Sequence, residues 1–334
     1  MAPMDGITDA AFRHIVCKYS KPSFVMTEFV NVEGLARGAW KMLKSFFYGE
    51  RERPIIAQIY GVEVESFYKA AVMLCSLGFD GIDINMGCPV NKVAKRGSGA
   101  GLIQTPDLAR KIIRSVQKGC KDWSEGISLE EAGVHSDIIE RIDKFREKGL
   151  FGEREASRDL VPVSVKTRIG YSQDTAVEWA KELLETEPAC LIMHGRTLKQ
   201  MYMGEANWES LAAVAKICAE QSIPFIGNGD VKSIKDAKKR IKKFGVDGVL
   251  VGRGMLGNPW FFDGVGDDEI TYEMRRDIAL EHSEYFIEIL GEFLPYAHIK
   301  KHLAYYIRSF DGAREIRKKL MLVENLDEAR VVLG

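Results

Sequence analysis

The chain has 334 residues, of which 46% are hydrophobic and 28% charged, and its formal net charge is -1. This composition is ordinary for a globular protein and excludes disordered, collagen-like and mucin-like classes. At ~150 residues per domain, the length allows one large domain and one small one. The sequence has no run of about 18 apolar residues, and its first residues are too polar for a secretory signal. We therefore expect a cytoplasmic protein that is not inserted in a membrane.

The six cysteines are widely spaced and form no Cys-x-x-Cys pair. Neither a zinc site nor an iron–sulfur cluster has a ligand set, so we expect no metal and free thiols in a reducing compartment. Because the net charge is close to zero, any binding of nucleic acid must depend on local basic patches.

Short apolar runs alternate with longer stretches of helical periodicity along most of the chain. Repeated strand–helix units of this kind predict a parallel sheet. The expected strands cover residues 24–28, 55–60, 81–87, 161–168, 190–195, 223–229 and 247–253. The expected helices between them lie near 63–77, 106–118, 174–186, 207–220 and 233–244.

An eighth strand would come from Ala2, Pro3 and Met4, which precede a turn and a helix-like segment. Eight strand–helix units over ~250 residues are typical of a (β/α)8 TIM barrel, and this α/β fold is the one that we predict. Almost nothing precedes Ala2. Either the recorded start codon lies too far downstream or the barrel closes with a stub.

Two segments depart from this alternation. Residues 119–159 are highly charged and are expected to be an insertion with one amphipathic helix near 136–148, most simply a solvated decoration. After Asp263 no further strand is expected, and the rest has apolar residues at helical spacing. We predict a barrel domain over 1–263 and an all-helical domain over 264–334.

Polar residues at strand ends are the candidates for an active site, because TIM barrels carry their sites at the C-terminal ends of the strands. Ser164, Lys166 and Arg168 share one face of the strand at 161–168. Two cations at that place indicate an anionic ligand. The alternative is a pair of structural salt bridges to Asp83 or Glu28.

A cysteine follows the strand at 81–87. Asp83 and Asn85 share a face of that strand, and the chain then turns through Gly87 to Cys88. A lone cysteine is more often a small buried hydrophobe, and Cys88 fits that description least of the six because its loop lies over the barrel mouth.

The last three strands end in further candidates. His194 ends the strand at 190–195, where a structural and a functional role are equally plausible. Glycine-rich loops at 227–230 and 252–260 follow the last two strands, where this fold usually holds a phosphate. Together with Lys166 and Arg168, these loops favour a phosphorylated cofactor.

Six segments carry a resemblance to a known family. They are, in chain order, APMDGITD, INMGCPVNKVAKRGSGAGLI, VKTRIG, IMHGRT, GNGD and VLVGRGMLGNPW. In this order they resemble the dihydrouridine synthases, flavin enzymes that reduce specific uridines in transfer RNA. The resemblance covers nearly the whole chain, since KHLAYYIRSF followed by AREIRKK is similar to the family's C-terminal RNA-binding helical domain. The short first strand and the charged insertion depart from the family pattern.

The resemblance implies an FMN site with NADPH as the reductant. The reduced flavin would deliver hydride to carbon 6 of a uracil, Cys88 would protonate carbon 5, and Lys166 would stabilise the charge on the reduced flavin. Asn85 and Arg168 match positions near the flavin and the target uracil. The implied FMN-binding residues are Pro3, Met4, Asp5, Gln58, Lys166, His194, Asn228, Gly229, Asp230, Gly252 and Arg253.

An RNA substrate also requires cations. Residues 232–243 are mostly Lys and Arg with the single acid Asp236, and residues 300–319 are also rich in cations, with aromatic residues between them. We predict that Lys300, Lys301 and Arg308 contact the tRNA. The alternative for each segment is a solvated helix face.

Two other classes of protein stay open. A small-molecule FMN barrel oxidoreductase, similar to dihydroorotate dehydrogenase, would share the phosphate loops and the strand-end lysine but would not need the basic tail. A flavin-free RNA-binding protein on the same scaffold would not be an enzyme. In each case we expect a monomer.

Overall fold

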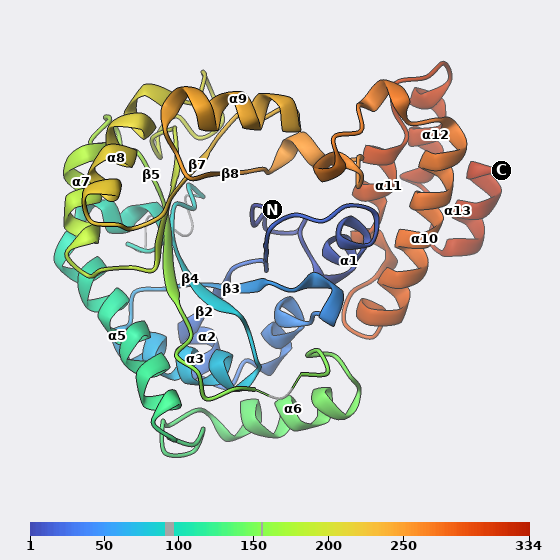
Figure 1. Cartoon of the computed structure of the whole chain (residues 1–334). Coiled ribbons are helices and arrows are strands. Elements are labelled where there is room, and N and C mark those ends of the chain that lie inside the picture. The colour runs from blue at the N-terminus through green and yellow to red at the C-terminus, as the bar shows by residue number, and fades with distance from the viewer. Residues whose placement is uncertain (91–96, 155) are drawn as a thin grey trace.

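The computed structural model describes residues 1–90, 97–154 and 156–334. Within them, one parallel sheet curves into a barrel with helices on its outside (Figure 1). Its strands are β1 (Val25–Met26), β2 (Val30–Asn31), β3 (Ile55–Tyr60), β4 (Gly81–Met86), β5 (Val163–Arg168), β6 (Cys190–His194), β7 (Phe225–Asn228) and β8 (Gly248–Leu250). Neighbours along the sheet run in chain order from β3 to β8, and β1 and β2 both pair with β3. The predicted TIM barrel with a helical region is therefore confirmed.

The helices around the barrel are α1 (Ala10–Tyr19), α2 (Val32–Ala36), α3 (Val64–Ser76), α5 (Pro106–Ser124), α6 (Ser136–Glu147), α7 (Ala176–Leu184), α8 (Trp208–Glu220) and α9 (Ile234–Phe244). The helical region contains α10 (Tyr272–Leu290), α11 (Lys300–Tyr306), α12 (Ala313–Leu320) and α13 (Leu326–Leu333). Side chains cap several helix starts; Asp9 accepts from the Phe12 N–H and Ser233 from the Asp236 N–H. The basic helix α9 ends at Gly245, whose φ is 66°.

The first turn of the barrel differs from the prediction. Residues 24–28 do not form one strand, since β1 and β2 are two short strands separated by Glu28 and its neighbours. Ala2 to Met4 form no regular strand, yet the Ala2 N–H donates to the Val251 carbonyl at 2.7 Å, and the Met1 nitrogen lies 2.7 Å from the Phe24 carbonyl. This segment therefore joins the end of β8 to the start of β1 and closes the barrel.

The helix after β4 is longer than predicted. It continues from Pro106 to Ser124 instead of ending near residue 118, because Cys120 and Trp123 extend its buried face. Gly119 does not end the helix: a Cβ there would lie 2.8 Å from the Cβ of Ala71, so the glycine allows α3 and α5 to approach closely. The insertion thus begins after α5.

The insertion is more than a solvated decoration. Helix α6 lies within the predicted 136–148 and buries Phe145, whose ring centroid is 5.5 Å from that of Phe293. The ammonium group of Lys148 lies 2.7 Å from the Glu292 carboxylate. The insertion therefore contacts the chain that follows α10.

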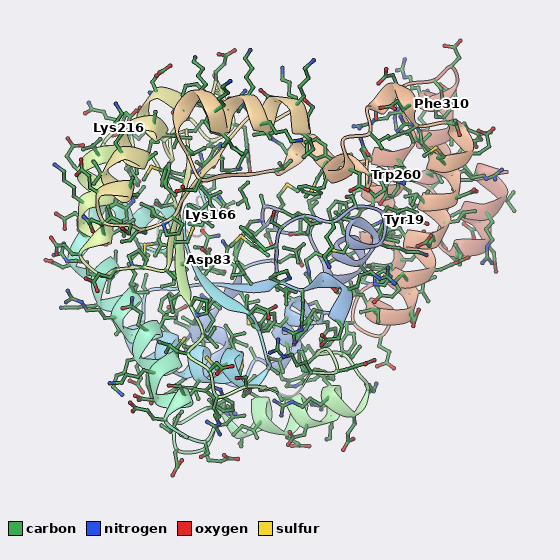
Figure 2. The ribbon with its side chains drawn as sticks, in the orientation of Figure 1. Tyr19, Asp83, Lys166, Lys216, Trp260 and Phe310 are labelled. Atoms are coloured by element: carbon green, nitrogen blue, oxygen red, sulfur yellow. The ribbon has the colours of Figure 1, made fainter. Side chains whose placement is uncertain are left out.

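Helix α10 packs against α1 along the side of the barrel (Figure 1). Lys18 and Tyr19 of α1 both bond the carboxylate of Glu281, and Tyr19 lies beside Trp260 with ring centroids 5.3 Å apart (Figure 2). None of the helices in the described ranges is both long and apolar enough to cross a membrane.

Candidate active site

The strand ends carry polar side chains that the sheet register brings together. Asp83 of β4 is paired with Gln58 of β3 and with Ser164 of β5, and two residues further on Asn85 is paired with Lys166. The same register aligns Arg168 with His194 and His194 with Asn228. Figure 2 shows Asp83 and Lys166 on neighbouring strands inside the barrel. Predicted site residues from β3 to β7 therefore converge on one end of the sheet.

The Cys88 turn, residues 85–88, is held from two sides. The Asn85 side-chain oxygen accepts from the Gly87 N–H at 3.0 Å and from the Cys88 N–H at 2.9 Å. The Arg168 Nε donates to the Gly87 carbonyl at 2.7 Å. Cys88 is 7% exposed. Burial raises the pKa of its thiol, with the Asp5 charge adding to the rise and Arg168 and Lys166 opposing it.

A line of buried polar groups stands behind this turn. The Ser164 hydroxyl donates to Asp83 at 2.6 Å, the Gln58 amide donates to Asp83 at 2.7 Å, and the Asn85 amide donates to the Gln58 oxygen at 2.9 Å. We call these four residues the buried polar chain. Its members are all less than 9% exposed.

The two strand-end cations do not form the close ion pairs that the sequence offered as an alternative. Among the residues that the structure describes, neither Lys166 nor Arg168 lies within salt-bridge distance of Asp83 or Glu28. Burial, and then the Arg168 charge, lower the pKa of Lys166 to about 8. The Lys166 Nζ is 3.4 Å from the Asn228 side-chain oxygen. Buried cations that lack a close ion pair at the end of a barrel strand suit an anionic ligand.

His194 stays neutral near neutral pH. Burial lowers the pKa of its ring well below the usual range, and the nearby Arg168 and Lys166 charges lower it further. Its Nε2 lies 3.3 Å from a guanidinium nitrogen of Arg196. A neutral imidazole beside cations can accept or donate a hydrogen bond without adding charge.

Arg196 is a site residue that sequence reasoning missed. It is 2% exposed, and its guanidinium bonds both Asp230 oxygens at 2.9 and 2.7 Å and the Gly204 carbonyl at 2.6 Å. Asp230 also accepts from the Ala206 N–H at 2.8 Å. Both Asp230 oxygens are therefore hydrogen-bonded by groups of the protein itself. Arg196 lies in the HGRT segment. Only His194 of that segment was a candidate, because only His194 ends an apolar strand.

Glycines after β7 and β8 allow close packing of the loops at the barrel mouth. Gly229 has φ 135°, and a Cβ there would lie 2.6 Å from the Ala206 Cβ, so no larger residue fits. After the neighbouring strand β8, Gly252 lies next to Met4, whose sulfur would be 3.5 Å from a Cβ at Gly252. Arg253 follows with a side chain that is 56% exposed. These loops bring residues 2–4 beside the β8 loop.

The N-terminal side of the mouth is acidic. Loss of solvation raises the pKa of Asp5, of Asp9 and of Glu28, and the pKa of Glu28 reaches about 7 because Asp9 and Asp5 add to the rise. One Glu28 oxygen is buried without a hydrogen-bond partner. The Lys301 charge opposes the rise at Asp5 and Asp9.

The three cations predicted to contact RNA have different surroundings. The Lys301 ammonium lies beside Gly6, 3.3 Å from where a Cβ would be, and so faces the barrel acids. Arg308 is paired with Asp267 at 2.8 Å. The Lys300 Nζ is 3.3 Å from the Met321 carbonyl. By contrast, most cations of α9 are exposed, which agrees with the alternative that this helix presents a solvated face. The exposed cations are Lys235, Lys238, Lys239, Lys242 and Lys243.

The central feature is thus a parallel barrel with buried cations and a shielded cysteine at its mouth, an arrangement suited to an enzyme that binds an anionic ligand. The family described as "Dihydrouridine synthase (Dus)" matches residues 1–125 and 154–333. The chain therefore belongs to the dihydrouridine synthase family, as its sequence motifs predict. The matched ranges leave out residues 126–153 of the insertion.

Curated relatives match over the full length of the chain. It is 32% identical over 339 residues to "Probable tRNA-dihydrouridine synthase" of Staphylococcus aureus (strain COL), covering 100% of this chain and 91% of that protein. It is 32% identical over 342 residues to "Probable tRNA-dihydrouridine synthase 2" of Bacillus subtilis (strain 168), covering 100% and 92%. A solved DHODH from Eimeria tenella, in complex with ferulenol, is 19% identical with a TM-score of 0.43 over 72% of this chain and 62% of that one, which is too weak to support an argument.

Proposed function

We propose that this protein is an FMN-dependent tRNA-dihydrouridine synthase that uses NADPH to reduce a uridine of tRNA to 5,6-dihydrouridine. The observation that carries the proposal is the Cys88 turn: a shielded thiol at the mouth of a barrel, between Arg168 and Asn85, in a chain of this family. The family and the names of the relatives support the reaction; the cofactors and the role of the thiol are our inference.

The residues at the mouth are compatible with FMN. The glycine-rich loops after β7 and β8 are of the kind that bind a phosphate through backbone N–H groups, and Asp230 is already neutralised by Arg196. Lys166 has a lowered pKa and, among the described residues, one long contact, to Asn228, which leaves hydrogen-bonding capacity for an anionic ring edge. Once bound and reduced by NADPH, FMN would supply the hydride for carbon 6 of the uracil. The remaining proposed FMN contacts are Pro3, Met4, Asp5, Gln58, His194, Gly229, Gly252 and Arg253.

Cys88 is suited to give up one proton at a chosen moment. Its raised pKa keeps the thiol protonated at neutral pH, so the S–H proton is available for carbon 5 of the uracil. The resulting thiolate would lie near the Arg168 and Lys166 charges, which favour the ionised form. Asn85 and Arg168 hold the backbone of Gly87 and the Cys88 N–H in place and would also contact the uracil.

The tRNA would be held by cations outside the barrel mouth. The exposed lysines of α9 support this, because an RNA backbone is recognised chiefly through its phosphates. We include Lys300, Lys301 and Arg308 in the proposed contact surface, with the helical domain beginning near residue 264. We further propose that the enzyme acts as a monomer in the cytoplasm, where its tRNA substrate is made.

The test is the dihydrouridine content of an unmodified tRNA pool after incubation with the protein, FMN and NADPH, measured by nucleoside mass spectrometry. Dihydrouridine should appear, and Cys88→Ala should remove most of it, about 100-fold or more for the loss of a general acid. Cys218→Ala is the matched control, because Cys218 is a buried thiol of α8 outside the site. A flavin-containing protein that oxidises NADPH but makes no dihydrouridine would instead favour a small-molecule substrate.

A further inference from the structure

We propose that Asp83 and Ser164 are positioning residues, which hold the Cys88 turn in place through the buried polar chain. Neither residue lies within the NMGCP or HGRT segments, and neither is assigned a role by the proposed reaction. The inference rests on the proposed function only in taking Cys88 as the group whose position matters.

The contacts run without a gap from β5 to the cysteine. Ser164 donates to Asp83 at 2.6 Å, and Gln58 donates to the other Asp83 oxygen at 2.7 Å. Asn85 donates to Gln58 at 2.9 Å and accepts from the Cys88 N–H at 2.9 Å. Because no member is exposed enough for water to replace a lost partner readily, a break in the chain leaves an unsatisfied buried group.

The direction of the chain is fixed at both ends. An ionised carboxylate only accepts hydrogen bonds, so Asp83 requires the nitrogen of the Gln58 amide. The backbone N–H groups of Gly87 and Cys88 only donate, so they require the oxygen of the Asn85 amide. Only one orientation of the Gln58 and Asn85 amides satisfies both ends. Asp83 therefore anchors the amide that orients Asn85, and Asn85 in turn fixes the backbone of the turn.

Asp83 has a second possible role that the test must separate from the first. Its carboxylate also interacts with the Lys166 charge, so its removal could act through Lys166 instead of through Gln58. Asp83→Asn separates the two roles. The asparagine keeps an oxygen for Gln58 and can donate to the Ser164 hydroxyl, but it has no charge for Lys166.

The measured quantity is the rate at which iodoacetamide alkylates Cys88 across a range of pH. The rate is followed by peptide mass spectrometry on the full-length protein with saturating FMN. A loosened turn would expose the thiol and bring its pKa down towards that of a free cysteine. We expect Asp83→Ala to speed alkylation about fivefold, the factor that corresponds to one lost hydrogen bond. Asp83→Asn should stay close to the wild type, and Ser164→Ala should lie between them.

Two further variants keep the test decisive. Gln58→Met breaks the chain in the middle and keeps the Asp83 charge, so it should behave like Asp83→Ala and replaces it if that variant does not fold. Because Gln58 is also a proposed FMN contact, this variant and the wild type are compared without FMN as well. Ser76→Ala is the control, because the Ser76 hydroxyl is also buried but bonds only within α3, to the Met73 carbonyl. It should leave Cys88 alkylation unchanged.

Two results would overturn the inference. The first is wild-type alkylation of Cys88 in a folded Gln58→Met or Asp83→Ala protein. The second is an Asp83→Asn protein that behaves like Asp83→Ala, since Asp83 would then act through its charge. Alkylation needs neither tRNA nor NADPH, so these results are distinct from a failure to form dihydrouridine, which would contradict the proposed function alone.

Discussion

The two sides of the barrel mouth are built in opposite ways. On the side of β5 and β6, the buried cations Arg168 and Arg196 have their guanidinium groups bonded to backbone carbonyls and to Asp230. On the N-terminal side, Asp5 and Glu28 have raised pKa values, and Glu28 keeps an unpartnered buried oxygen. The comparison teaches that the two arginines of the cationic side are held by hydrogen bonds within the protein, whereas the carboxyl groups of the acidic side have charges that depend on pH near neutrality.

The largest effect is expected on the cationic side, from Arg196→Met. This change removes both contacts between Arg196 and the Asp230 carboxylate and frees the Gly204 carbonyl. We expect the free energy of unfolding to fall by about 3 kcal/mol, the lower end for breaking a buried pair because Asp230 is partly exposed. Urea denaturation of the variant and the wild type measures this difference in the free energy of unfolding.

Arg253→Met is the control for that prediction. Arg253 also approaches Asp230, at 3.7 Å, but its side chain is 56% exposed. Its loss should change the free energy of unfolding by less than about 1 kcal/mol. Equal effects of the two variants would show that the cationic side is not a special scaffold.

A smaller effect is expected on the acidic side, from Glu28→Gln. The folded pKa of Glu28 is raised from 4.5 to about 7, so its contribution to stability is complete below pH 4.5 and is lost as pH rises through 7. Glutamine does not titrate. The variant should therefore gain at most about 3 kcal/mol relative to the wild type at pH 8 and nothing at pH 4. Thermal unfolding of both proteins across this pH range measures the difference in stability. A gain in stability that increases as pH falls would contradict the prediction.

The sequence predicted the cationic side well because that side lies on strand ends. Alternation along a strand places Lys166 and Arg168 on one face, and parallel pairing then brings Asn85 and His194 beside them. Arg196 was missed because it follows the strand and acts through the loop that it binds. A local pattern does not show which loop a side chain will reach.

The acidic side needed the three-dimensional structure. Asp5, Asp9 and Glu28 come from a loop, a helix cap and a gap between two short strands, so no single periodicity links them. The basic tail was interpreted only from its composition. Composition does not distinguish a lysine that faces solvent from Lys301, which faces acids some 300 residues earlier in the chain.

The smallest effect tests that placement of Lys301. Lys301→Met should lower the free energy of unfolding at pH 7 by about 1 kcal/mol, because the Lys301 charge stabilises ionised Asp5 and Asp9. The difference should shrink as pH falls towards 4, where those carboxyls take up protons. Lys300→Met is the matched control. Within the described part of the chain the Lys300 ammonium bonds the Met321 carbonyl alone, so its loss should be nearly neutral at both pH values. The contrary result is that the two lysine variants have the same free energy of unfolding at pH 7 and bind tRNA equally weakly. Lys301 would then contact RNA without stabilising the acidic side.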